Sequence, residues 1–446
     1  MSRSRRIPLM TLSLIIVNVV VYVLTSYEGA LLNISNYWVV LGGFIPSLLA
    51  SSTHVYRIFS SMFLHADLFH ILFNMYFLYL FGRAIEDALG RLRFLALYII
   101  SGIMASLFHT VFSFLGGISA YTIPAIGASG AISGILGAYL ILFPGTTLIM
   151  GWLFFIFPVF MRLKAVYYLI FWFAAQVIYG YAKIGGGIAF FAHAGGFVAG
   201  MALLPLIVSR EVLARLRLAW RQAALPSTIY VHAPRTAGLS LATKVIISIL
   251  LVSLLIGAAY AITGLPVKGD IKSMMISYAY NGKPYMDYLG FQVPNVEDQL
   301  TRISLDETRI LLNRLYAADL LYDKAKANRE VYVNDWSGRL LVRIGGQLVP
   351  VELLIISFRG YYDGDGFLSS CRGELKTQVI LIDARGIRVS DYMVHYDFEA
   401  TSQTVKLEVI THVPALLSLA TTAFALAVIL IKDKELTIVG EREELS

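Results

Sequence analysis

Long apolar runs separated by short polar turns dominate the chain. Runs long enough to cross a membrane as helices lie at about residues 7–26, 68–86, 94–115, 125–143, 165–182, 188–208, 245–263 and 414–431. Roughly 20 residues of helix are needed to cross the hydrocarbon core of a bilayer. The pattern therefore predicts an all-α polytopic membrane protein, in which the first six helices form a core and two further helices follow.

One additional apolar run, Leu148–Met161, is too short to span. As a helix its 14 residues would reach roughly 21 Å, against the ~30 Å of the hydrocarbon core. We expect this segment to be an interfacial or buried hairpin.

Basic residues near the helix ends predict the orientation of the helices. Cytoplasmic loops of membrane proteins carry an excess of lysine and arginine. The connection at 116–124 has no charged residue, and we expect it on the outer side. The clusters expected in the cytoplasm are Arg3, Arg5 and Arg6; Arg83, Arg91 and Arg93; Arg162 and Lys164; and Arg210, Arg215, Arg217 and Arg221. They predict a multi-pass protein whose N- and C-termini are both cytoplasmic.

A polar stretch between the last two spanning runs predicts a second unit. It contains a helix-like segment near Glu297–Asn328, followed by strand-like runs at Leu340–Ile344, Val349–Phe358, Gln378–Ile382 and Thr404–Ile410. We therefore expect an extracytoplasmic α+β domain. The predicted organisation is a six-helix core at 1–208, a basic cytoplasmic linker at 209–243 with Pro226 and Pro234, a seventh helix at 244–263, the outer domain at 264–412, an eighth helix at 413–431 and a cytoplasmic tail at 432–446.

The composition agrees with a membrane protein and argues against several functions. Hydrophobic residues make up 57% of the chain and charged residues 15%, whereas soluble domains carry roughly 25% charged residues. The net charge of +7 arises beside the apolar runs, without a basic stripe interleaved with aromatics, so we expect a lipid bilayer and no nucleic acid as partner. This sequence has one cysteine, Cys371, which excludes an internal disulfide and a cysteine-rich metal site. We expect no cofactor and no metal.

Four polar residues from three predicted helices lie near the outer ends of those helices. They are Ser129 in the fourth helix, His193 in the sixth, and His70 and Asn74 in the second, where a spacing of four puts both on one face. Polar side chains in spanning helices are costly and usually functional. A serine can instead bond a backbone carbonyl, and an asparagine can join two helices. Asp67 is more simply explained as a residue that begins the second helix.

The motifs around these residues resemble the rhomboid family of intramembrane proteases. They are Gly127-Ala-Ser129-Gly130, Ala192-His193-x-x-Gly196 with Gly200, His70-x-x-x-Asn74, Gly82-x-x-x-Glu86 and Phe63-Leu-His65, and they follow the family's order over about residues 8–208. The glycines, together with Gly134 and Gly137, also fit close packing of small residues between helices. Two positions depart from the family's pattern. Tyr56-Arg57 replaces a Trp-Arg pair often seen in the first outer loop, and Ser133 stands where some members have a tyrosine that packs on the catalytic histidine.

The resemblance implies an intramembrane serine endopeptidase of the cell membrane that hydrolyses peptide bonds in or near transmembrane helices of membrane-protein substrates. A serine is a weak nucleophile until a base takes its proton, and the resemblance implies a dyad of Ser129 as nucleophile and His193 as base. The core has no third acid at that depth. The resemblance assigns oxyanion stabilisation to Asn74 and His70. It also implies a lateral gate at the fifth helix and the loop with Gly185–Gly187, although three glycines can equally form a plain turn.

Other functions have less support. An aspartyl intramembrane protease needs two membrane-embedded aspartates, and a zinc type needs a His-Glu-x-x-His helix; neither pattern occurs in the core. A transporter would be expected to show paired broken helices or an acidic relay. A non-catalytic rhomboid-like protein that binds and escorts membrane helices would be expected to lack the serine or the histidine. We predict that the outer domain tunes substrate access and takes no part in catalysis; the alternative is an independent binding or structural module.

Overall fold

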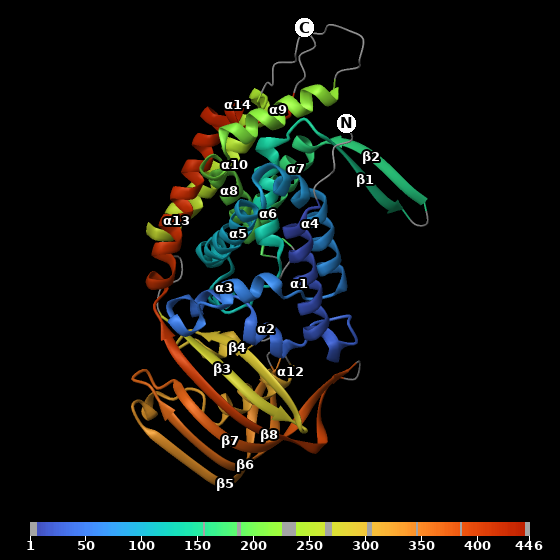
Figure 1. Cartoon of the computed structure of the whole chain (residues 1–446). Helices are drawn as coiled ribbons and strands as arrows, with labels where there is room; N and C mark the ends of the chain where they lie inside the picture. Colours follow the sequence, from blue (N-terminus) through green and yellow to red (C-terminus); the bar gives the residue numbers. More distant parts are fainter. Residues whose placement is uncertain are drawn as a thin grey trace.

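The protein is a bundle of membrane helices with a large β-sheet at one end (Figure 1). The computed structural model describes residues 7–154, 157–184, 189–224, 238–263, 270–300, 306–344, 347–383 and 386–441. Within these residues, seven helices are long and apolar enough to cross a membrane. They are α1 (Leu9–Ser26), α4 (Leu68–Leu89), α5 (Arg91–Phe112), α7 (Ala165–Ala182), α8 (Phe190–Ile207), α10 (Leu241–Thr263) and α13 (Leu407–Ala427). The chain is therefore a multi-pass membrane protein.

Helix α6 (Ser129–Leu142) is shorter than the predicted span at 125–143. Its 14 residues reach roughly 21 Å, which is less than the ~30 Å thickness of the hydrocarbon core. Every residue from Gly130 to Leu142 is buried, as expected for a helix that is apolar on all sides. It is the central helix of the bundle and packs against α5 and α8.

Small residues set the distance between α6 and α8. A methyl group on Gly196 would collide with the carbonyl oxygen of Gly130, and one on Gly200 would collide with the carbonyl of Gly134. The predicted packing role of these glycines is confirmed. Such close backbone contact is what brings side chains from the starts of the two helices into the same place.

The start of α1 is joined to the end of α4 by Glu86. Its buried carboxylate accepts the backbone N–H groups of Met10 (3.0 Å) and Thr11 (2.8 Å) and the Thr11 hydroxyl (2.7 Å). The first N–H groups of a helix have no partner within the helix, so Glu86 acts as a cap from a neighbouring helix.

The connection between α1 and α4, which we call the first loop (residues 27–67), is built from short helices. They are η1 (Tyr27–Gly29), α2 (Asn36–Gly42), η2 (Pro46–Ala50), η3 (Ser52–His54), α3 (Arg57–Ser60) and η4 (Ser61–Phe63). The buried Arg57 guanidinium donates to the carbonyls of Val40 and Gly43. The Tyr56 hydroxyl donates to the Leu41 carbonyl at 2.8 Å. The Tyr56-Arg57 pair therefore holds the loop together.

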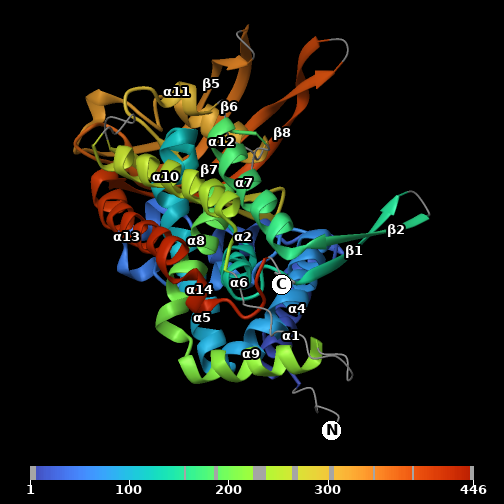
Figure 2. The same cartoon turned by 90° about the horizontal axis from the view of Figure 1, so that it is seen from above.

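The short apolar run is a hairpin, as predicted, and it is made of strands. Strand β1 (Thr147–Phe154) pairs antiparallel with β2 (Phe157–Lys164), with Thr147 opposite Lys164. The hairpin projects from the side of the bundle in both views (Figures 1 and 2).

We call residues 270–405 the sheet region. Among its described residues, six antiparallel strands occur in the order β4-β3-β8-β7-β6-β5. Their bounds are β3 Ile271–Tyr280, β4 Lys283–Phe291, β5 Glu330–Ile344, β6 Gln347–Tyr362, β7 Leu368–Asp383 and β8 Gly386–Val405. Helices α11 (Val296–Leu300) and α12 (Asp306–Ala317) contribute to one shared apolar core with the strands.

The sequence predicted only part of this region. The runs at 340–344, 349–358 and 378–382 lie in β5, β6 and β7, but the strands β3 and β4 were missed. Asn281-Gly282, with both φ angles positive, forms the turn between them, and this pair is a strong hairpin signal. The predicted strand at 404–410 is wrong beyond Val405, because α13 already begins at Leu407. In the predicted helical stretch at 297–328, the described residues form α11, α12 and η7 (Lys324–Lys326).

At the end of the molecule away from the sheet lie α9 (Arg210–Ala224) and α14 (Asp433–Leu436) (Figure 1). The segment η8 (Val428–Lys432) directly precedes α14. The segment predicted as a linker is thus partly helical; Pro226 and Pro234 lie outside the described residues. After α14, the backbone N–H groups of Ile438 and Val439 donate to the carbonyl of Leu142. The C-terminal segment therefore caps the last turn of α6. The remaining short helices, η5 (Ser113–Gly116) and η6 (Ile118–Tyr121), follow α5.

Candidate active site

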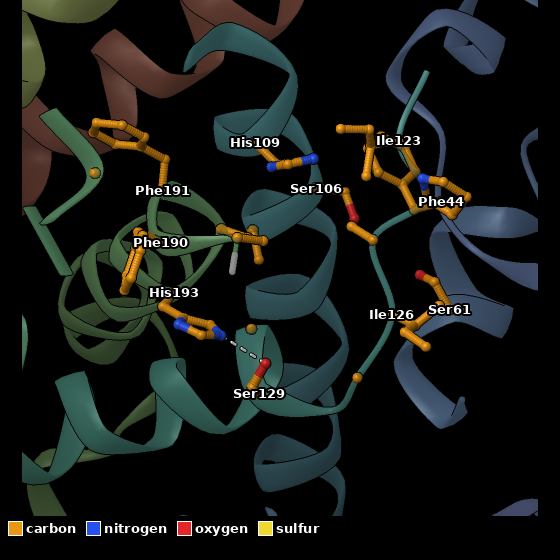
Figure 3. Close-up of a pocket in the computed structure, with 18 of the residues that line it drawn as sticks. Phe44, Ser61, Ser106, His109, Ile123, Ile126, Ser129, Phe190, Phe191 and His193 are labelled. Carbon is orange, nitrogen blue, oxygen red and sulfur yellow. Dashed lines mark hydrogen bonds between the residues drawn. The ribbon is translucent and has the colours of Figure 1, made fainter. Parts of the chain in front are cut away.

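The four predicted site residues line one cavity of about 770 Å³. Its walls come from α4, α5, α6, α7 and α8, from the first loop and from the segment that leads into α6 (Figure 3). Ser129, His193, His70 and Asn74 come from three helices that are far apart in the sequence. The structure therefore brings these four residues together around one cavity.

Ser129 is the first residue of α6, and the chain before it is held in place by backbone bonds. Ala125 exchanges both backbone hydrogen bonds with Phe44, at 2.8 and 2.9 Å, and the Gly127 N–H donates to the Ser61 carbonyl at 2.8 Å. The Ala128 N–H points to Nε2 of His65 at 3.4 Å. Burial lowers the pKa of His65 to about 3, so this imidazole is neutral and can accept the bond. The position of the serine is thus fixed by the first loop.

His193, in the first turn of α8, lies next to Ser129. Its Nε2 atom is 2.8 Å from the serine Oγ (Figure 3). This is hydrogen-bond distance, and it is the geometry that a general base needs to take a proton from a nucleophile.

The other ring nitrogen of His193 contacts a residue that the sequence reasoning missed. Nδ1 lies 2.8 Å from Oε1 of Gln176 on α7, and the Gln176 side chain is buried. The Trp172 ring lies one turn earlier on the same helix, with its centroid 6.0 Å from that of His193. A signal was present, because Gln176 is the amide inside an otherwise apolar run, and intramembrane polar residues are usually functional. Ser133, four residues after Ser129, donates its hydroxyl to the Ser129 carbonyl at 2.6 Å.

His70 places the Nε2 edge of its ring next to Gly127, two residues before Ser129. Its Nδ1 accepts the Ala66 N–H at 3.3 Å, so the ring proton is on Nε2. A methyl group on Gly127, whose φ is +124°, would lie 2.8 Å from this Nε2 and 3.5 Å from the Ser129 Oγ. Only glycine fits between the two groups. Asp67 caps α4 by accepting the His70 backbone N–H at 2.8 Å, and its predicted role at the helix start is confirmed.

Asn74 lies one turn further along α4 and is 7% exposed. Its Nδ2 donates to the His70 carbonyl at 2.8 Å. An amide nitrogen carries two hydrogens, so one N–H remains for a ligand in the cavity. Asn74 and His70 therefore carry two hydrogen-bond donors in the wall of the cavity that Ser129 also lines.

In the part of the chain that the structure describes, no group of three or more histidine, cysteine, aspartate or glutamate side chains could hold a metal ion. Gly185–Gly187, where a gate was expected, lie outside the described residues. Helix α7 before them ends at Ala182, and its last turns contribute Tyr179 and Gly180 to the cavity wall.

The sheet region is docked on the segments that frame the cavity. Strand β4 contacts α2 of the first loop and η6, which precedes α6. Tyr288 of β4 is buried in a cluster with Val40, Ile45 and Leu48 of the first loop. The Asn36 amide donates to the Met286 carbonyl of β4 at 2.7 Å.

The comparisons with known proteins concern the helical core. Residues 52–210 match a family model described as the Rhomboid domain. RHOMBOID-like protein 1 of Arabidopsis thaliana is 34% identical over 163 residues, which is 36% of this chain and 37% of that protein. Inactive RHOMBOID-like protein 8 of the same plant is 35% identical over 100 residues, or 22% of this chain and 26% of that protein. Rhomboid protease AarA of Providencia stuartii is 32% identical over 140 residues, or 30% and 50%. This chain thus matches no more than half the length of each of these relatives.

Proposed function

Because residues 52–210 match a family model described as the Rhomboid domain, we propose that this chain is an intramembrane serine endopeptidase that uses Ser129 and His193 as a dyad. The observation that carries the proposal is the distance of 2.8 Å between His193 Nε2 and Ser129 Oγ. The substrates are membrane proteins with a transmembrane helix, cleaved in or near that helix. Support comes from the cavity, which lies within the helical bundle and is lined by both residues.

The first half of the reaction forms an acyl-enzyme. Nε2 of His193 takes the hydroxyl proton as the Ser129 Oγ attacks the carbonyl carbon of the scissile bond. The carbonyl π pair moves onto oxygen and gives a tetrahedral oxyanion. When this intermediate collapses, the C–N bond breaks and His193 returns the proton to the leaving amine. The acyl group stays on Ser129 as an ester.

The oxyanion is stabilised by three hydrogen-bond donors of the site. They are Nε2–H of His70, the second N–H of the Asn74 amide and the backbone N–H of Ser129. Each donor of this kind is typically worth roughly 10²–10³ in rate. The proximity of His70 to Gly127 and Ser129 supports this role.

The second half consumes one water. His193 takes a proton from the water, the hydroxide attacks the ester carbonyl, and the Ser129 oxygen leaves with the proton returned by His193. Water reaches the bond through the cavity. The wall contributed by the end of α7 supports α7 and the loop after it as the lateral entrance for the substrate helix.

We propose that the sheet region at 270–405 controls which substrates reach this cavity. Its strand β4 rests on the first loop and on η6, which are the segments that hold the chain before Ser129. All four site residues lie in the helical core. The sheet region therefore acts on access, and the chemistry belongs to the core.

The proposed location is the cell membrane, with both chain ends in the cytoplasm and the sheet region outside. The basic residues at the helix ends support this orientation. A Tyr392→Cys variant tests it, because Tyr392 is 58% exposed in the sheet region. Burial raises the pKa of the native Cys371 thiol to about 12, so it stays unreactive in the folded chain. We expect an impermeant maleimide to label the Tyr392→Cys variant in intact cells. Labelling only after lysis would show that the sheet region lies in the cytoplasm.

The activity is tested with a fluorophosphonate probe on the purified full chain. We expect the wild type and Ser106→Ala to be labelled, and Ser129→Ala to be unlabelled. Ser106 is the matched control, because it lines the same cavity from α5. The second candidate is a non-catalytic protein that binds membrane helices, which the inactive plant relative brings into consideration. No labelling of a folded wild type, together with retained binding of a membrane helix, would favour that candidate.

A further inference from the structure

We propose that Gln176 is a positioning residue that holds the His193 imidazole in the one tautomer able to act as a base. The inference rests on the proposed function and adds a third member behind the dyad. Gln176 acts through His193 and needs no contact with the substrate.

The two contacts of the ring fix where its proton must be. A neutral imidazole has one N–H and one lone pair. Nε2 faces the Ser129 hydroxyl at 2.8 Å and needs its lone pair to take that proton. The ring proton must therefore be on Nδ1, which lies 2.8 Å from the Oε1 of Gln176. The amide oxygen accepts only, so the opposite tautomer would set two acceptors against each other.

The burial of Gln176 explains why its amide needs the hydrogen bond to His193. The Gln176 side chain is 8% exposed, and its neighbours Phe173 and Val177 are buried apolar residues. An amide inside an apolar spanning helix is costly unless it is hydrogen-bonded. The hydrogen bond to His193 offsets the cost of burying this amide.

An amide also fits the charge changes of the reaction. When His193 takes the serine proton, the ring becomes positive and both nitrogens carry hydrogens. The negative end of the Gln176 amide dipole then faces Nδ1–H and stabilises the imidazolium. A neutral partner does this without burying a permanent charge in the membrane.

The same helix also restrains the plane of the ring. Trp172 is four residues before Gln176, so both project from one face of α7. The Trp172 and His193 rings are 6.0 Å apart with their planes 35° from parallel. Ser133 on α6 donates its hydroxyl to its own helix backbone, so the ring contact described for His193 comes from α7. The orientation of the base therefore depends on the position of α7.

The test compares two Gln176 variants of the full chain. Gln176→Leu keeps the size and loses the acceptor, whereas Gln176→Glu keeps an acceptor oxygen in either protonation state. We expect Gln176→Leu to lower kcat about 10- to 100-fold with KM nearly unchanged, a loss between that of one hydrogen bond and the roughly 10⁴-fold effect of a wrong tautomer in a triad. Gln176→Glu should recover most of kcat. Probe labelling of Ser129 should slow in parallel with kcat.

The control is Asn18→Leu, which removes a buried amide from another spanning helix, where its Nδ2 bonds the Leu14 carbonyl. Its kcat should stay within about twofold of the wild type, since it lies outside the site. The proposal is overturned if Gln176→Leu keeps kcat, or if Leu and Glu lower it equally. An inactive and unlabelled wild type would instead overturn the proposed function.

Discussion

The Nε2 atom of His193 lies 2.8 Å from the Oγ of Ser129, although the two residues are 64 positions apart. Two groups that react as one unit should not have additive effects when removed. We therefore expect Ser129→Ala and His193→Ala each to abolish cleavage of a membrane-helix substrate, and the double variant to be no worse than either. Cleavage rates of the three variants, each checked for folding by its melting temperature, provide the measurement. Substantial cleavage by folded Ser129→Ala would contradict the assignment.

Loss of either hydrogen-bond donor on α4, His70 or Asn74, should lower the kcat of cleavage. His70→Ala and Asn74→Ala are each expected to lower kcat by roughly 10²–10³, since each removes one donor to the oxyanion. The probe should still label Ser129, but slowly, because the dyad is intact. Asn18→Ala is the control for loss of a buried amide. If either α4 variant kept its kcat and only melted earlier, that residue would be structural.

Glu86 should matter for stability and little for catalysis. Its carboxylate accepts three hydrogen bonds from Met10 and Thr11 at the start of α1. Glu86→Ala leaves these buried donors unpaired, which costs about 3 kcal/mol. We expect a clearly lower melting temperature in detergent. Asp87→Ala, the next residue along, is the control, and an equal loss in both variants would argue against the cap.

Separating the sheet region from the first loop should change substrate selection. Removing everything after residue 210 would also remove α13, which packs on α5 and α8, so a point variant is the better test. Tyr288→Ala removes the aromatic ring that packs against Val40, Ile45 and Leu48 of the first loop. We expect near-normal cleavage of a short transmembrane peptide and altered cleavage, by about threefold or more, of the same helix carrying a bulky outer domain; a buried aromatic anchor is typically worth more than this.

The control for that variant is Tyr392→Ala, an exposed tyrosine of the same region. Equal loss of both substrates in Tyr288→Ala, with the core still folded, would mean that the sheet region belongs to the catalytic unit. No change for either substrate would favour an independent module.

The sheet region should become less stable as pH rises toward neutrality. Burial raises the pKa of Asp287 in β4 to about 6, whereas an unfolded aspartate titrates near 3.9. The folded state therefore holds this proton more tightly. The resulting stability is complete below about pH 4 and is lost as pH rises through about 6, in total about 3 kcal/mol. Asp287→Asn should remove this part of the pH dependence. Melting curves of both proteins at pH 5 and 7.5 provide the measurement, and an identical dependence in the two would refute it.

The sequence alone determined the membrane class and most of the spanning helices, and it singled out the four residues of the proposed site. Apolar length is a local property, so α1, α4, α5, α7, α8, α10 and α13 could be found from their runs. Ser129, His193, His70 and Asn74 stood out because polar residues in apolar helices are costly, and because motifs at the helix starts surround them.

Other features depended on distant parts of the chain. Helix α6 ends at Leu142, where the returning C-terminal segment binds its last carbonyls. The docking of Tyr288 on the first loop joins segments that no local pattern relates.

Gln176 shows most clearly what the sequence alone could not predict. Its amide was visible in the sequence, but its partner was not, because the contact depends on how α7 and α8 are rotated and spaced. Close glycine packing of α8 on α6, with Gly196 against the Gly130 carbonyl, sets part of that geometry. Side-chain pairing between helices is decided by such packing of whole helices, and a pattern along one helix does not contain it.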